Sequence, residues 1–279
     1  MSLRDSVLSR AFLSASRLPW PDAGALRRKA SAAVLAMVVP ALLLYLWQLA
    51  SLHAWVPAMI LPEPRLVLDS LSDLWRSGEL AAHLGISLSR LVLGFLVGAL
   101  AGLFLGFAMG LSRVVEAYVY PTFKALSQVP ALGWIPLAIM LAGIDEAMKV
   151  IVVAKAAWVP VAINTQQAIR NIPEEFLEVG RIYRFNLAQR LTRIVVPGAL
   201  PGIFNGIRYG LTHAWLALVT VELLASSEGI GFLVIWGRQL AQLDIVLAVI
   251  VVIGLIGSSI DQALQWVELH FLAWRRTAF

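Results

Sequence analysis

Four ionisable residues lie within otherwise apolar stretches of the sequence: Lys155, Arg208, His213 and Glu222. If these stretches cross a bilayer, each charge is costly, and it marks either a polar pathway or a contact neutralised by a partner in the helix bundle or at a subunit interface. Three further charged residues lie nearer the ends of such stretches and are predicted to be interfacial: Arg90, Asp244 and Asp261.

Other site chemistry is not supported by the residue pattern. The four histidines are far apart in the sequence, and cysteine is absent, which disfavours a metal site. The sequence lacks a Gly-x-x-x-x-Gly-Lys-Ser/Thr phosphate loop, so this chain is not predicted to hydrolyse a nucleotide. No apolar stretch offers a nucleophile with a base, or a His-Glu-x-x-His motif, as an intramembrane hydrolase would need.

Composition explains where these residues must sit. Of the 279 residues 59% are hydrophobic and 14% charged, and the mean hydropathy is +0.80, far from a soluble domain. The net charge of +5 does not indicate nucleic-acid binding, because the basic residues fall between apolar runs rather than in one aromatic-interleaved patch. The sequence therefore predicts an all-α membrane protein.

Apolar stretches of about 20 residues predict about six transmembrane helices. They lie near residues 30–52, 91–112, 125–144, 148–168, 200–224 and 243–267. The third is interrupted by Pro130, Gly133, Pro136 and Gly143, which predicts a kinked helix. Residues 64–78 predict a short amphipathic helix at the outer interface, with Pro64 in its first turn and Gly78 at its end.

The second stretch carries a glycine at every fourth position: Gly94, Gly98, Gly102, Gly106 and Gly110. On a helix these residues form one smooth face that lets a neighbouring helix approach closely. We predict a packing face and not a phosphate-binding loop.

The charge distribution predicts the orientation. With the N-terminus in the cytoplasm, the inner segments hold fifteen basic residues and the outer segments at most four, so both termini are predicted to be cytoplasmic. The predicted organisation is a tail at 1–29, a first span and outer helix at 30–83, a five-helix core at 84–268 that includes a cytoplasmic loop at 170–200, and a tail at 269–279.

That cytoplasmic loop predicts two short helices joined by a turn. Pro173, Glu174 and Glu175 suit the start of the first, in which Phe176, Val179 and Tyr183 share a face. Asn186 with Gln189 can cap the second, which is predicted to end at Val196, before Pro197. Two such helices would form a protrusion to which a soluble partner could bind.

The same loop resembles the cytoplasmic signature of ABC importer permeases, which is Glu-Ala-Ala, three residues, Gly, nine residues, Ile, any residue, Leu-Pro. Here Glu178, Val179 and Gly180 are followed at matching spacing by Arg184 and by residues 194–197, Ile-Val-Val-Pro. Further stretches resemble the nitrate/sulfonate/taurine branch, and the resemblance covers nearly the whole chain after residue 30. They include Leu-Pro-Glu-Pro at 61–64, Gly-Ile-Gly-Phe at 229–232 and Leu-Ala-Trp-Arg at 272–275.

Arg184 departs from the family pattern, which has glycine at that position. A left-handed backbone there would cost arginine about 1 kcal/mol. We therefore expect the turn to shift, with Asn186, which tolerates that conformation, as its new position.

The resemblance implies a type I (MetI-like) permease bundle in the bacterial inner membrane. Such a subunit pairs with a second copy, binds two ATPase subunits that hold ATP and magnesium, and receives a small anion such as an aliphatic sulfonate, taurine or nitrate from a periplasmic binding protein. This chain would hold no cofactor. The expected ATPase-coupling residues are Glu174, Glu175, Phe176, Glu178, Val179, Gly180, Tyr183, Arg184 and Pro197, and the expected pathway residues are Lys155, His213 and Glu222.

The main alternative is a stand-alone secondary transporter or channel driven by an ion gradient. Such a protein would be expected to have repeated halves and carboxylates within the membrane, and Glu222 alone is weak support.

Overall fold

A computed structural model describes residues 23–271, so most of the predicted tails, residues 1–29 and 269–279, lies outside the described part. Within that part the chain forms helices and no strand. It divides after Pro64 into two compact units. The first contains α2 (Ala23–Leu52), where the Trp47 indole N–H donates to the Pro62 carbonyl oxygen at 2.9 Å.

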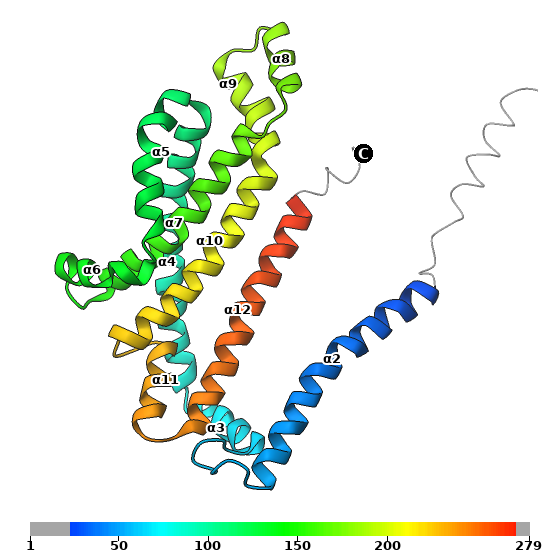
Figure 1. Cartoon of the computed structure of the whole chain (residues 1–279), viewed down its shortest axis with the longest axis vertical. Coiled ribbons are helices and arrows are strands. Elements are labelled where there is room, and N and C mark those ends of the chain that lie inside the picture. Colours follow the sequence, from blue (N-terminus) through cyan, green and yellow to red (C-terminus); the bar gives the residue numbers. More distant parts are fainter. Residues whose placement is uncertain (1–22, 272–279) are drawn as a thin grey trace, which may run out of the picture. The chain divides into compact units, whose positions relative to one another are not determined.

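The second unit is a bundle whose long helices run up and down (Figure 1). Along the chain come α3 (Pro64–Arg76), α4 (Glu79–Leu111), α5 (Arg113–Gln128), the 3-10 turn η1 (Ala131–Trp134), α6 (Ile135–Ala142), α7 (Glu146–Arg170), α8 (Glu174–Ile182), α9 (Leu187–Arg190), the π turn η2 (Leu191–Val195), α10 (Val196–Ala225), α11 (Ile230–Gln239) and α12 (Leu243–Phe271). Helices α8 and α9 lie at one end of this bundle, and α11 lies at the other.

The centre of the bundle is the contact of α4 and α10 with α7. All five glycines of the ladder in α4 lie against α7, where an added Cβ would come closer than 3.0 Å to an α7 atom. At Gly98 that atom is the backbone carbonyl oxygen of Ala154. Because a carbonyl of a neighbouring helix cannot rotate away, glycine at position 98 sets the distance between the two helices.

The predicted third span is not a single kinked helix. Helix α5 ends at Gln128, and the chain bends by 94° before η1 and α6. Pro130 has no amide hydrogen and disfavours a helical conformation at Val129, which is extended. The break therefore falls at Pro130, and Gly133 and Pro136 lie beyond it in η1 and α6.

Helices occupy the positions of all six predicted spans. Among the described residues, three helical stretches are long and apolar enough to cross a bilayer, 79–111, 187–239 and 243–270, and the bent pair of α5 with α6 makes a fourth if it counts as one span. The apolar part of α2, Met37–Leu52, is shorter. Helix α7 occupies the position of the fourth predicted span, and its buried face carries the polar Lys149, Thr165 and Gln166.

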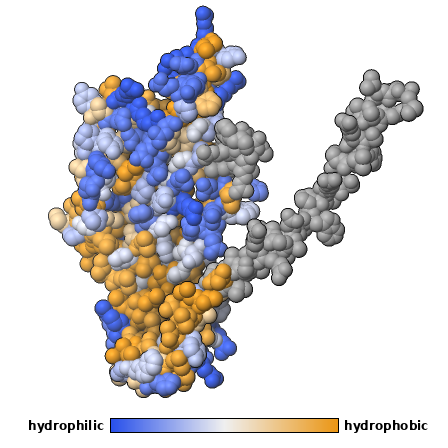
Figure 2. Space-filling view, turned by 45° about the vertical axis from the view of Figure 1, so that its right-hand side comes forward, coloured by the Kyte–Doolittle hydropathy of each residue, from blue (hydrophilic) through white to orange (hydrophobic). Residues whose placement is uncertain are grey.

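The predicted amphipathic helix is confirmed as α3, with Val67 and Leu74 buried and Ser70 bonded to Asp244 of α12 at 2.5 Å. Hydrophobic residues cover much of the lower part of the face in Figure 2, whereas hydrophilic ones gather toward the α8 end.

Candidate functional site

Helices α8 and α9 form a hairpin, residues 174–195, at the end of the bundle (Figure 1). Its second helix begins with the predicted cap: the Asn186 side chain accepts from the Gln189 amide at 2.8 Å, and the Gln189 side chain accepts from the Asn186 amide at 3.0 Å. This reciprocal pair satisfies two amides that a helix start leaves unbonded. The start of the second helix is thus built as the sequence predicts.

The turn of the hairpin remains on Arg184. Its φ is +51°, whereas Asn186 is extended with φ −70°, so the expected shift to Asn186 is wrong. The Phe185 amide donates to the Gly180 carbonyl at 2.9 Å and the Arg184 amide to that of Arg181 at 3.0 Å, which is a Schellman ending. Asn186 is needed as the cap of α9, so the left-handed residue stays at 184.

The hairpin presents a row of large apolar side chains to the exterior. Phe176, Val179 and Tyr183 are exposed, on the face predicted from their spacing. Two more were missed: Ile182 is 77% exposed and Leu187 is 74% exposed. The helical repeat from Phe176 through Val179 points to Ile182, whereas Leu187 follows the turn as the first residue of α9 and lies outside that repeat.

The remaining predicted coupling residues divide into two groups. Glu174, Glu175, Glu178 and Arg184 are exposed on the hairpin. Gly180 is instead buried against the Ile194 side chain, and Pro197 lies in the first turn of α10. These two support the hairpin from within and do not contribute to its exposed surface.

The second helix was predicted to end before Pro197, but it continues past this residue. The π turn η2 leads directly from α9 into α10, and the Val196 amide donates to the Leu191 carbonyl five residues back. This wider turn avoids the clash that proline makes with the carbonyl four residues earlier in an α-helix. Helix α9, η2 and α10 therefore form one continuous helical stretch, residues 187–225.

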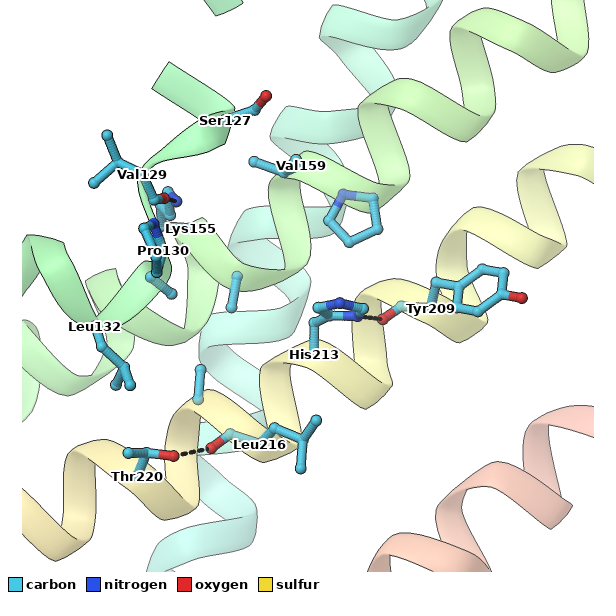
Figure 3. Close-up of a pocket in the computed structure, with 14 residues that line it drawn as sticks. Ser127, Val129, Pro130, Leu132, Lys155, Val159, Tyr209, His213, Leu216 and Thr220 are labelled. Carbon is cyan, nitrogen blue, oxygen red and sulfur yellow. Dashed lines mark hydrogen bonds between the residues drawn. The ribbon is translucent and has the colours of Figure 1, made fainter. Parts of the chain in front are cut away.

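A groove of about 500 Å³ runs between α7, α10 and the break after α5 (Figure 3). Lys155 on α7 and His213 on α10, both predicted pathway residues, line it from opposite walls. Most other lining residues are apolar, with Ser127, Tyr209 and Thr220 as the polar exceptions. We call this the α7–α10 groove.

Both predicted groove residues also make local contacts. The Lys155 ammonium donates to the Val129 carbonyl, at the end of α5, and lies 5.7 Å from the centre of the Trp134 ring. The Nδ1 atom of His213 lies 2.8 Å from the Tyr209 carbonyl oxygen. Lys155 thus holds the break between α5 and η1 while its positive charge remains at the groove.

Glu222, the third predicted pathway residue, lies elsewhere. It is buried and accepts hydrogen bonds from the Ser87 hydroxyl, the Arg90 guanidinium and the Gly231 amide, at 2.8 to 3.0 Å. Gly229, with φ +106°, borders this carboxylate so closely that a Cβ would overlap it. Glu222 therefore joins α10 to α4 and α11 and does not line the groove.

Arg90, which was predicted to be interfacial, is 2% exposed and lies among partners from other helices. Besides Glu222 it contacts Glu146 of α7 at 2.5 and 2.6 Å, and Glu146 also accepts from Lys149 at 2.7 Å. A buried guanidinium needs such partners on several sides. We call Ser87, Arg90, Glu146, Lys149 and Glu222 the Arg90 network.

Arg208, the fourth intramembrane candidate, is neutralised by α12. Its guanidinium makes two parallel bonds to Asp261, at 2.7 and 2.8 Å. Across the described residues, no three His, Asp or Glu side chains gather in a way that could hold a metal ion.

Known proteins resemble this chain over most of its length. SsuC of Bacillus subtilis, named as an aliphatic sulfonates transport permease protein, is 36% identical over 95% of this chain and 97% of its own length. The taurine transport system permease protein TauC of Escherichia coli is 31% identical over 96% and 98%. A solved chain of the MetNI methionine ABC transporter, in an inward-facing form, matches the fold at a TM-score of 0.50 and 18% identity over 76% of this chain and 97% of that one.

The family model for the inner membrane component of binding-protein-dependent transport systems matches residues 94–271. This region contains the glycine ladder, the groove and the α8–α9 hairpin. The chain therefore belongs to the binding-protein-dependent transport system inner membrane component family, the permease subunits of ABC importers.

Proposed function

We propose that this permease carries a small anion, with aliphatic sulfonates, taurine and nitrate as the candidate class, along the α7–α10 groove. The observation that carries the proposal is the unbroken helical stretch of α9, η2 and α10, which leads from Leu187 in the hairpin to the groove wall. The substrates named for the relatives favour this class.

The hairpin would be the docking point of the ATPase. An exposed row of Phe176, Val179, Ile182, Tyr183 and Leu187 is unusual for a surface with no partner. Exposed carboxylates at Glu174, Glu175 and Glu178 would surround this row and help to orient the partner. ATP and magnesium would be bound by two copies of that partner and not by this chain.

Movement would reach the groove through α10. Leu187 of the hairpin and His213 of the groove belong to the same helical stretch, so a displacement of the hairpin on ATPase closure would move one groove wall relative to α7. Alternating access would then follow from rigid-body motion of helices in two paired permease copies.

The polarity of the groove suits an anion. Lys155 supplies positive charge and His213 a polar ring, and no Asp or Glu within residues 23–271 lines the groove. The buried Glu222 belongs to the Arg90 network and is not part of the proposed pathway. The α8–α9 end would face the cytoplasm, with both termini on that side, and a periplasmic binding protein would deliver the anion at the α11 end.

The proposal is tested by changing the hairpin surface in the permease reconstituted with its ATPase. Phe176→Asp with Ile182→Asp, or Glu178→Lys alone, should lower ATP-driven anion uptake by about 30-fold, as expected for a disrupted contact centre. The melting temperature of the permease should not change, since these side chains are exposed. Val114→Asp, equally exposed at the same end but outside the hairpin, is the matched control.

Normal uptake by the hairpin variants would disprove the coupling role. Uptake by the permease without an ATPase, driven by an ion gradient, would instead support the stand-alone transporter.

A further inference from the structure

A second cavity, of about 410 Å³, lies between the last residues of α4 and α7 and the α8–α9 hairpin. Its walls are largely aliphatic and include Leu111, Leu177 and Leu191. Its charged lining residues are Arg113, Arg170, Arg190 and Glu174. We call this cavity the α8 cleft. It lies apart from the α7–α10 groove and shares no residue with it.

The three arginines are not equivalent. Arg170 is neutralised by Glu116 at 2.5 Å and also donates to the Met109 carbonyl at 3.0 Å. Arg113 and Arg190 form no ion pair with any residue in the described range 23–271. The unpaired guanidinium groups of Arg113 and Arg190 thus outnumber the one carboxylate that lines the cleft, that of Glu174.

The cleft also lies at a defined level of the bundle. Leu111 is the last residue of α4, which is one of the helices apolar enough to cross a bilayer, and Arg113 begins α5 two residues later. A basic residue directly after an apolar span lies where phospholipid phosphates are found, and basic pockets at that level bind acidic head groups.

We infer that the α8 cleft binds one acidic phospholipid. Its phosphate lies between Arg113 and Arg190, and the upper part of an acyl chain lies along Leu111, Leu177 and Leu191. The lining accounts for both halves of such a ligand, because unpaired cations attract the phosphate and the aliphatic wall excludes water from the chain. Since Arg113 begins α5 and Arg190 ends α9, the lipid braces the hairpin against the bundle.

The inference is tested by native mass spectrometry of the full-length permease in detergent with added phosphatidylglycerol. The wild type should retain one phosphatidylglycerol per chain and no phosphatidylcholine, which has no net charge. Arg113→Gln with Arg190→Gln should weaken retention by about 30-fold, given the attraction of each basic residue for an acidic lipid. Arg113→Lys with Arg190→Lys should retain the lipid, because the charges remain.

The matched control is Lys124→Gln with Arg181→Gln, which removes the same charge from exposed positions outside the cleft. Equal retention by the wild type and the glutamine pair would overturn the inference. Displacement of the lipid by millimolar inorganic phosphate would also overturn it, since the cleft would then be a site for a free phosphate ion.

Discussion

At the α11 end of the bundle, Arg90 and Glu222 are buried, and each is bonded to side chains or amides from other helices. At the opposite end the hairpin leaves Ile182 and Leu187 more than 70% exposed and its carboxylates without partners in the described structure. One end satisfies its polar groups internally, whereas the other end presents apolar and charged groups outward.

This difference indicates that the charged residues of the α11 end stabilise the fold, whereas those of the hairpin are available to a partner. A buried charge that loses its partner is strongly unfavourable, so the Arg90 network should be sensitive to any single change. Exposed side chains contribute little to the folded state, so the hairpin can be altered without unfolding the bundle. The contrast between the two ends leads to predictions about stability that differ in size and sign.

The largest effect is expected from Arg90→Met. This change leaves the Glu222 carboxylate buried without its guanidinium partner, and it should destabilise the bundle by about 3–5 kcal/mol. The measurement is thermal unfolding of the purified permease in detergent. Arg76→Met, at an exposed arginine of α3 that forms no ion pair with a residue of the described part of the chain, should have almost no effect.

Adding Glu222→Met to Arg90→Met should restore part of the lost stability, because it removes the uncompensated carboxylate. A drop in melting temperature no larger than that of Arg76→Met would show that the network does not stabilise this end.

A smaller loss is expected from Gly98→Ala in α4. The new methyl group would meet the Ala154 carbonyl of α7, and such overpacking costs about 1–3 kcal/mol. Gly85→Ala in the same helix is the matched control, because no atom lies within 4 Å of its Cβ position. That change should raise stability by about 0.5–1 kcal/mol through helix propensity. Equal effects of the two would contradict close packing at the ladder.

Local sequence patterns predicted the parts of the fold that depend on nearby residues. The four-residue spacing from Gly94 to Gly110 indicates a smooth helix face, and Asn186 with Gln189 specifies a helix start, because both depend on residues within one or a few turns. The exposed face of Phe176, Val179 and Tyr183 follows from the same periodicity.

Contacts between distant residues were not predictable in this way. Arg90 and Glu222 are 132 positions apart, so no spacing rule pairs them, and Arg90 alone resembles an interfacial arginine. Because Glu222 lies within an apolar stretch, the sequence also suggested a pathway residue. In the structure, Gly229 and Gly231 at the start of α11 pack against its side chain. The sequence did not specify at which residue the break after α5 falls, because several prolines and glycines lie within fifteen residues.

The smallest effect concerns Arg184, where the hairpin keeps a turn that its residue type disfavours. Arg184→Gly should stabilise α8 by about 1 kcal/mol, because glycine adopts the positive φ without strain. Hydrogen exchange of the Phe185 amide, which is bonded to the Gly180 carbonyl, measures this local stability. Arg181→Gly, three residues earlier within the helix, should have the opposite sign. Faster exchange in Arg184→Gly would mean that the arginine side chain itself stabilises the turn. The hairpin would then depend on a charged side chain for its stability, as the α11 end depends on Arg90.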